Sequence, residues 1–459
     1  MTKPPGVKIG CFFSNQFLNK LLTKNPSKMK TINIIICAIL SSTILSCTTS
    51  KTTKVANQEE YNKYLQNITT TSESLAQKEL DFWQKKLNNQ PTQYPYLSKI
   101  AKANTLLFSE KGNISYLIEA EEKLLKINQK TNYNKASHLR SLARNYISQH
   151  RFKESLELLK KAEVNGENLN ATQKMLFDVY LELGDPNKAS EYLAEIENYA
   201  DFDYLIRVSK WHDYKGDLSS AIRFMEKAMK KAEEANNKDL KAWSYTNLAD
   251  FYGHNGQIKD SYKLYLKALE LDNSNAYAKK GIAWIVYSHD KNADEALRIL
   301  DIISSEHSSP DYYLLKAEIA EFKNNLTMKE SNIEVYLSAV KNSSYGVMYN
   351  QHLAKLYLEE FNDTSSALLY IEKEIESRST PQSYDLLAWY YYKNKEFKKA
   401  LEVINTHVVD KTFEPEIQYH IAEIYKANGI NDKAMALKEE LLDSSFELGP
   451  LMTEKILSI

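Results

Sequence analysis

A repeat of 34 residues is the feature that most constrains the fold of this chain. Small residues recur at this interval at Ala354, Ala388 and Ala422, and each is followed three positions later by a Tyr. A repeat of this length is one supersecondary unit, which cannot bury its apolar face alone. The sequence therefore predicts a row of stacked units, each of which contacts mainly its neighbours.

The clearest unit spans residues 243–272 and contains two predicted helices around a turn at 254–256. Large and small residues recur on each helix at intervals that place them on one face. Ala or Ser on that face lets two antiparallel helices approach closely where they cross. These residues are Tyr245, Leu248, Ala249 and Tyr252 in the first helix, and Ser261, Tyr265, Ala268 and Leu269 in the second.

This unit resembles the tetratricopeptide repeat, whose pattern is W-x2-L-G-x2-Y, then A-x3-F, then P. Tyr245 stands at the Trp position, Ala249 at the Gly position and Tyr265 at the Phe position, while Asn273 replaces the final Pro. The resemblance implies an all-α fold, an α-solenoid of about ten helical hairpins wound into a right-handed superhelix. It covers residues 95–445, and it implies that the first helix of each hairpin lines the concave face.

The segments that flank the repeats are also predicted to be helical. Apolar residues with helical spacing predict an N-terminal helix in residues 58–94, and residues 446–459 are expected to form a capping helix. The whole chain has only 12 Gly and 10 Pro in 459 residues, which indicates short and few loops.

The N-terminus has the features of a bacterial lipoprotein signal. Residues 1–46 form the predicted signal peptide, which is over-extended if the true start is Met29 instead of Met1. A basic flank precedes an apolar run from Thr31 to Leu45, too short for a typical transmembrane helix. The residues that end it, 44–47, resemble a lipobox, which implies that Cys47 becomes the acylated first residue. The alternative is an uncleaved anchor helix with an incidental Cys.

The resemblance to a lipoprotein implies a location as well. Residues 47–57 are then a flexible, lipid-anchored linker of polar composition. The mature chain is expected in the bacterial cell envelope, facing the periplasm, on the outer membrane.

Known catalytic motifs are absent from the sequence. It contains no P-loop, nucleophile elbow or dinucleotide-binding glycine pattern, and its nine His form no close metal-binding pair. We therefore expect no catalytic residues, no metal and no cofactor. Residues after 46 carry 53 Lys and Arg against 60 Asp and Glu, a net charge of −7, which argues against nucleic acid as the main partner.

The expected binding surface is the side of each first helix that faces away from its hairpin partner. Basic residues dominate this side in the early repeats, and aromatic residues, which often dominate binding energy, are common in the late ones. The candidate partner-binding residues are Arg140, Arg144, Lys174, Arg207, Lys210, Trp243, Asn247, Asp250, Gln351, Lys355, Asp385, Trp389, Tyr392, Tyr419 and Glu423.

These features favour a non-catalytic scaffold that binds protein or peptide partners. Two alternatives remain open at the level of sequence. One is an outer-membrane lipoprotein that binds glycans on a scaffold of this type, although such proteins carry a loop-rich lobe that the low Gly and Pro content leaves little room for. The other is an accessory subunit of an envelope enzyme or secretion complex.

Overall fold

The computed structural model describes residues 54–66 and 71–459, which contain 23 α-helices, three short 3₁₀- or π-helical turns and no β-strand. Residues 54–459 form one compact unit. The predictions made for residues 1–53, including the signal peptide and the acylation of Cys47, lie outside the described residues.

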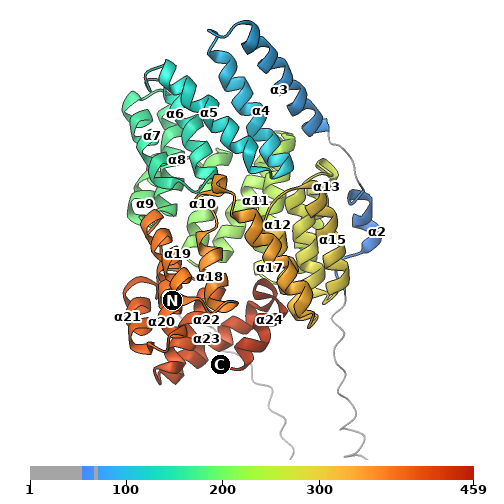
Figure 1. The fold of residues 1–459 in the computed structure, drawn as a ribbon, viewed down its shortest axis with the longest axis vertical. Helices are drawn as coiled ribbons and strands as arrows, with labels where there is room; N and C mark the ends of the chain where they lie inside the picture. The colour runs from blue at the N-terminus through green and yellow to red at the C-terminus, as the bar shows by residue number, and fades with distance from the viewer. Residues whose placement is uncertain (1–53, 67–70) are drawn as a thin grey trace, which may run out of the picture. The chain divides into compact units, whose positions relative to one another are not determined.

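Ten helical hairpins follow one another along this unit, which confirms the predicted all-α solenoid (Figure 1). The first five are α4–α5 (Pro95–Lys111, Ile114–Lys130), α6–α7 (Ala136–Ser148, Phe152–Asn165), α8–α9 (Leu169–Glu182, Pro186–Glu195), α10–α11 (Phe202–Tyr214, Leu218–Glu234) and α12–α13 (Lys238–His254, Ile258–Leu271).

The second five hairpins continue in the same way. They are α14–α15 (Ala276–Trp284, Ala293–Glu306), with the π-helical turn η2 (Ile285–His289) extending α14; α16–α17 (Asp311–Phe322, Leu326–Val340); α18–α19 (Asn350–Glu359, Thr364–Ser377); α20–α21 (Pro381–Lys393, Phe397–His407); and α22–α23 (Pro415–Ala427, Asn431–Asp443). A 3₁₀ turn, η3 (Ser343–Tyr345), precedes α18.

The repeated small residues lie where the sequence placed them. Ala249, Ala354, Ala388 and Ala422 are all fully buried, so the first helices approach their neighbours closely at these positions. Local capping signals fix several helix starts. At α9, for example, the Asp185 carboxylate accepts a hydrogen bond from the Lys188 backbone N–H (3.0 Å), and Pro follows at the first helical position.

The flanking segments differ in detail from the prediction. In place of one helix over residues 58–94, the structure has α2 (Gln58–Tyr61), the 3₁₀ turn η1 (Asn62–Tyr64) and α3 (Thr71–Asn89). The capping helix α24 (Ser445–Leu457) is kinked at Gly449, which has a φ of 77° and is followed by Pro450. This kink separates the part of α24 that caps the last hairpin from the part that reaches the middle hairpins.

Residues 55–57 do not behave as the flexible linker predicted for residues 47–57. The Val55 and Ala56 backbone N–H groups donate to the two carboxylate oxygens of Asp290, at 2.9 and 3.0 Å. The Tyr61 hydroxyl then donates to Glu295 at 2.7 Å. The chain is thus held against α13 and α15 from Val55 onward, and α2 lies beside α15 in Figure 1.

The C-terminal hairpins pack back against the N-terminal ones. The Ser308 backbone N–H donates to the Lys111 carbonyl at 2.7 Å, and the Lys153 ammonium donates to the Glu376 carbonyl at 2.5 Å. The turn between α8 and α9 lies against Ser379, in the link between α19 and α20. Figure 1 shows the same arrangement, with α9 next to α19. Turns within early hairpins therefore meet links between later hairpins, so the solenoid curls back until its early and later parts are in contact.

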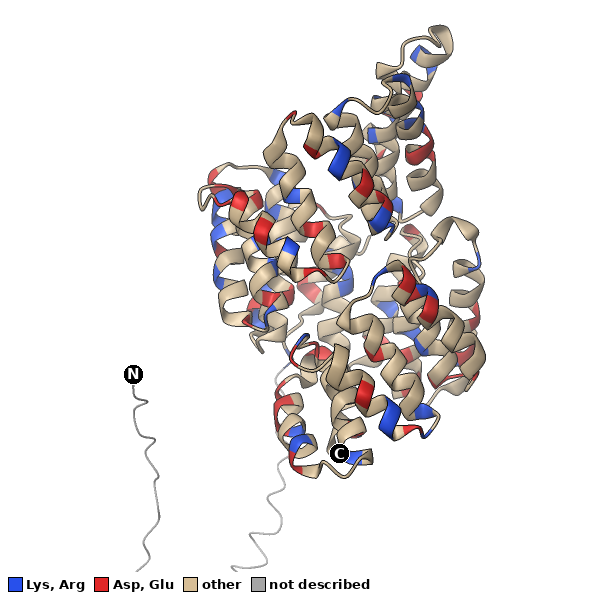
Figure 2. Cartoon of the chain, turned by 90° about the vertical axis from the view of Figure 1, so that its left-hand side faces the viewer, with Lys and Arg blue, Asp and Glu red and all other residues tan. Residues whose placement is uncertain are grey.

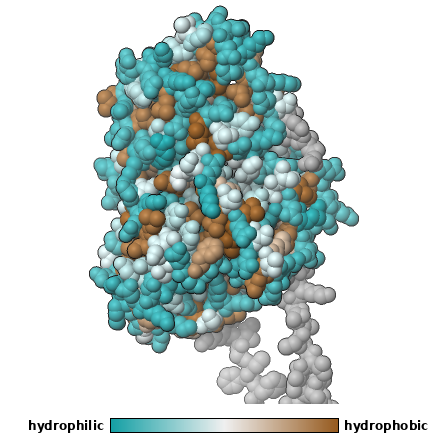
Figure 3. All heavy atoms as spheres, in the orientation of Figure 1, coloured by the Kyte–Doolittle hydropathy of each residue, from teal (hydrophilic) through white to brown (hydrophobic). Residues whose placement is uncertain are grey.

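The outer surface has mixed character. Figure 2 shows acidic and basic residues interspersed along the helices, and Figure 3 shows apolar side chains in scattered patches among hydrophilic ones. Within the described residues, every helix falls short of the length and apolar character that crossing a bilayer requires.

Candidate functional site

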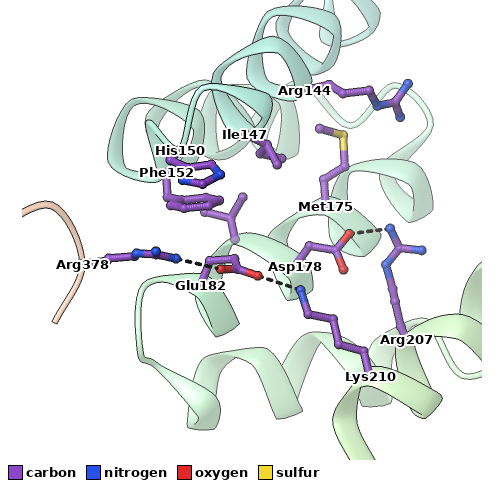
Figure 4. A pocket seen from close by; sticks show the side chains of 11 residues that line it. Arg144, Ile147, His150, Phe152, Met175, Asp178, Glu182, Arg207, Lys210 and Arg378 are labelled. Carbon is purple, nitrogen blue, oxygen red and sulfur yellow. Dashed lines mark hydrogen bonds and ion pairs between the residues drawn. The ribbon is translucent and has the colours of Figure 1, made fainter. Parts of the chain in front are cut away.

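The inner surface, formed by the first helices of the early and middle hairpins, contains two cavities. The first has a volume of about 500 Å³ and lies between α6, α8, α10 and the link from α19 to α20 (Figure 4). Its lining is strongly charged, with apolar groups at one end. The residues are Arg144, Ile147, His150, Phe152, Met175, Asp178, Val179, Glu182, Arg207, Lys210 and Arg378.

The charges of the first cavity largely pair with one another. The Arg207 guanidinium contacts Asp178 at 2.5 Å, and the Lys210 ammonium contacts Glu182 at 2.8 Å. Arg378, from the opposite side, reaches Glu182 at 3.3 Å. Burial alone would raise the pKa of Glu182, but Lys210 and Arg378 outweigh it and lower that pKa. The ion pairs of this cavity therefore connect the early hairpins to the link between α19 and α20. Arg144 is exposed at the edge of the cavity.

The second cavity has a volume of about 390 Å³ and lies among α12, α14, α16 and the start of α24. Aromatic and carboxylate side chains dominate it. It is lined by Ala249, Asp250, Gly253, His254, Ser261, Tyr265, Tyr277, Lys280, Gly281, Trp284, Ile285, Leu314, Leu315, Glu318, Phe446 and Glu447.

Two glycines in the second cavity let aromatic side chains pack closely against the backbone. A Cβ at Gly281 would lie 2.3–2.6 Å from ring atoms of Tyr265, and a Cβ at Gly253 would lie 2.8 Å from the ring of Phe446. The Phe446 carbonyl in turn accepts hydrogen bonds from Trp284 Nε1 (3.1 Å) and Ser288 Oγ (2.6 Å). The C-terminal helix thus forms one wall of this cavity.

Three carboxyl groups of the second cavity are held in a poorly solvated environment. Burial raises the pKa of Asp250, of Glu447 and of Glu318, the last to about 7. Asp250 accepts hydrogen bonds from the Tyr265 hydroxyl and from the Tyr277 hydroxyl, the latter at 2.6 Å. The His254 ring lies 3.7 Å from Glu447. The cavity therefore gathers three carboxyl groups against aromatic walls, where burial disfavours their charged forms.

Glu318→Gln is expected to stabilise the protein more strongly as the pH rises. Between the ordinary Glu pKa of 4.5 and the folded value of about 7, the folded state keeps a proton that the unfolded state loses. The wild-type free energy of unfolding therefore falls as the pH rises through this range. Gln escapes this loss, so the advantage of the variant should reach about 1–3 kcal/mol above pH 7. Urea unfolding at about pH 5 and pH 8 measures it, with the exposed Glu157→Gln as control. The same advantage at both pH values would contradict the assignment.

The early candidate residues predicted from sequence mostly form contacts within the protein. Arg140 donates to the Glu167 carbonyl at 2.7 Å, and Lys174 pairs with Asp201 and Asp203. Arg144, Arg207, Lys210 and Asp250 line the two cavities, as expected for an inner surface. Their role in partner binding stays a prediction.

Four candidates from the middle and late repeats are partly exposed or form contacts with neighbouring groups. Trp243 remains 41% exposed, and Asn247 donates to its carbonyl at 2.8 Å. Gln351 donates to Glu374 at 2.9 Å, while Lys355 contacts Glu416 at 2.5 Å. Burial alone would raise the pKa of Glu416, but the charge of Lys355 outweighs burial and lowers this pKa to about 2. Lys355 is therefore a structural cation that ties α18 to α22.

The expectation that the late aromatic residues are exposed in a groove is wrong for Trp389. Its side chain is 3% exposed and stacks between Tyr392 (ring centroids 4.5 Å apart) and His420 (4.0 Å). The other late candidates belong to the same packed cluster. Asp385 accepts from His420 at 2.8 Å, Tyr392 donates to Glu423 at 2.7 Å, and Tyr419 is buried. The cause is that each first helix here packs against the next first helix.

Several cavity residues were not singled out from the sequence. Glu318, Lys280 and Trp284 follow the same first-helix register as the predicted residues, so that register could have indicated them. Phe446, Glu447 and Arg378 come from distant segments, and nothing local in the sequence marks them. His289 and His254, which lie at equivalent hairpin turns, have separate partners: His289 contacts Asp290, and His254 faces Glu447.

The described residues contain no group of three or more His, Cys, Asp or Glu side chains placed to hold a metal ion.

Comparisons with known proteins identify the repeat in the middle of the chain. Residues 244–275 match the family model described as tetratricopeptide repeat. A TPR repeat-containing protein of Methanocaldococcus jannaschii, MJ1428, is 23% identical over 256 residues. That match covers 51% of this chain and 43% of the relative, so the chain spans less than half the length of the curated relative it matches.

Solved structures are also similar to this chain, at low identity. A solved structure of Pseudomonas aeruginosa pilF has 13% identity and a TM-score of 0.35, and the match covers 50% of this chain and 95% of pilF. The Cut9–Hcn1 hetero-tetramer of the APC/C has 13% identity and a TM-score of 0.33, with 84% of this chain and 93% of that one covered.

Proposed function

We propose that this chain is a lipid-anchored scaffold of a bacterial cell envelope that binds protein or peptide partners on the inner surface of its solenoid. In this proposal it has no catalytic role and needs no cofactor. The observation that carries the proposal is the pair of cavities on the inner surface, each lined by three successive first helices. Helical repeat proteins use extended surfaces of this kind to bind other molecules.

The repeat that matches the tetratricopeptide model contributes directly to this surface. Its helices α12 and α13 supply Asp250 and Tyr265 to the second cavity. Solenoids of this type generally serve as protein-binding scaffolds, which supports a protein or peptide partner.

The experiment that tests this function compares two kinds of ligand. After crosslinking in intact cells, the protein is expected to be recovered together with a defined envelope protein. In calorimetry, the purified protein is expected to show no affinity for envelope glycans. Retention of glycans without a protein partner would instead favour the glycan-binding alternative. Co-purification with an enzyme or secretion complex would place the chain there as an accessory subunit, which is a special case of protein binding.

Cys47→Ala is expected to block maturation of the protein. We propose that Cys47 is acylated and becomes the first mature residue, on the outer membrane and facing the periplasm. Without its thiol the precursor cannot receive lipid, so lipoprotein signal peptidase should leave it uncleaved. Two or more acyl chains are needed for stable anchoring, at about 0.8 kcal/mol per buried methylene. Mass spectrometry and membrane fractionation measure both effects, with Cys37→Ala as the matched control. Normal maturation of Cys47→Ala would refute the anchor.

A further inference from the structure

The second cavity holds more carboxylates than cations. Asp250, Glu318 and Glu447 line it, against Lys280 and His254. Lys280 forms no ion pair with any described residue. Its positive charge lowers the pKa of Asp250, but less than burial raises that pKa. Lys455, on α24, has a similarly small effect on the pKa of Glu318. The cavity therefore keeps an excess of negative charge that the chain itself does not balance.

Glu318 is the acid of this group that has no cationic partner among the described residues. It is partly buried, and it forms no ion pair with any described residue. The group that interacts with it is the buried hydroxyl of Tyr287, which is neutral and cannot balance its charge. A poorly solvated carboxylate without a cationic partner is costly, and a bound cation would remove much of that cost.

The position of Glu318 directs its carboxylate into the cavity. A Cβ at Gly449 would lie 3.0 Å from Glu318 Oε1 and 3.1 Å from Trp284 Cη2. Glu318 and the indole of Trp284 thus meet at the same wall, where the kink of α24 leaves room for both. The hydrogen bond from Trp284 Nε1 to the Phe446 carbonyl fixes the indole there.

Aromatic rings complete the chemistry of the cavity. Tyr265, Tyr277, Trp284 and Phe446 come from three different helices besides α12 and surround the carboxylates. Aromatic faces attract cations, and the attraction is stronger where water is excluded. A cavity of a few hundred cubic ångström with apolar walls and a few polar groups is typical of a ligand site.

We infer that the second cavity binds an ammonium or guanidinium group, such as the side chain of a Lys or Arg on a partner protein. This inference rests on the proposed function and names the chemistry that the inner surface recognises. A carboxylate ligand would be repelled, and an apolar ligand would bury the three acids without compensation. The raised pKa values of the three acids agree with a site that is incomplete without its cation.

Calorimetry on the full chain with three probes tests this inference. The probes are acetyl-Gly-Lys-Gly-amide, the same peptide with norleucine in place of Lys, and cadaverine as a free amine. The Lys peptide is expected to bind and the norleucine peptide is not. Cadaverine distinguishes the source of the cation: preference for the peptide assigns the site to a protein partner, and preference for cadaverine assigns it to a small amine.

Glu318→Gln should weaken binding of the cationic probe about tenfold or more, because a charged hydrogen-bond partner is lost from a partly buried site. Asp250→Asn should also weaken it, whereas Glu157→Gln, which removes the same charge from an exposed position on α7, should not. Thermal melting of each variant confirms that it is folded. Equal binding by wild type and Glu318→Gln, or equal binding of the Lys and norleucine peptides, would overturn the inference.

Failure of this inference can be told apart from failure of the proposed function. If no cationic probe binds while crosslinking still recovers a partner at the inner surface, only the cation site is wrong. If no partner contacts the inner surface at all, the proposed function is wrong.

Discussion

Trp389→Ala should lower the free energy of unfolding by about 3–5 kcal/mol, the usual cost of truncating a fully buried aromatic side chain. The indole is sandwiched between Tyr392 and His420, and its Nε1 donates to Glu359 at 3.0 Å. Its loss opens a cavity between α20 and α22 and leaves Glu359 without this donor. Because repeat proteins are stabilised by local terms, the C-terminal hairpins should lose most of the stability.

Urea unfolding combined with hydrogen exchange of α20 and α22 measures this effect. Trp243→Ala is the matched control, since that indole is 41% exposed and meets the ring of Phe202 edge-on. We expect the control to cost less than about 1 kcal/mol. Equal losses for the two variants would mean that Trp389 is not the packing residue described here.

Gly184→Ala should destabilise the protein by about 2–4 kcal/mol, because two separate costs add. Gly184 has a φ of 79°, a left-handed conformation that Ala adopts only with strain. A Cβ there would also lie 2.7 Å from the carbonyl oxygen of Ser379, which is backbone and cannot rotate away. The late hairpins would have to move away from the early ones.

Gly429→Ala separates the two costs of that substitution. Gly429 has a similar φ of 76°, but a Cβ there would meet nothing within 4 Å. This variant should show only the conformational cost, about 1–2 kcal/mol. Small-angle X-ray scattering should show a more open particle for Gly184→Ala alone. Identical stability and scattering for both variants would contradict the contact between early and later hairpins.

The sequence was sufficient to predict the hairpins, because their signals are local. Helical periodicity, small residues at crossings such as Ala249, and capping residues such as Asp185 act within one unit of about 34 residues. Each of these features has the same effect in every hairpin. This is why the all-α solenoid and its ten hairpins could be derived before the structure was known.

The contacts between distant hairpins could not be predicted in this way. The bond from Val55 to Asp290 joins positions 235 residues apart, and the pair of Arg378 and Glu182 joins positions 196 apart. No periodic signal specifies such pairs, because they depend on how tightly the superhelix winds. The same limit explains Trp389. Its register shows only that it faces away from α21, and the residue that covers it, His420, belongs to the next hairpin.

The second cavity combines residues that local signals could indicate with residues that only distant contacts place there. Asp250 was predicted for the inner surface because it lies on the side of a first helix that faces away from its hairpin partner. Glu318 occupies a comparable side of α16, but its surroundings include Gly449 and Trp284, which come from different parts of the chain. The wall formed by α24 likewise depends on the kink at Gly449 and on how the solenoid curls back.

Site-specific photocrosslinking in intact cells tests the central claim, that partners bind on the inner surface, most directly. A benzophenone amino acid would replace Tyr277, which is 56% exposed beside the second cavity, or Leu369, which is 50% exposed on the second helix α19. The account predicts that a defined protein is crosslinked from position 277 and not from position 369, and that Glu318→Gln reduces the yield. Equal crosslinking from both positions, or crosslinking from position 369 alone, would contradict it.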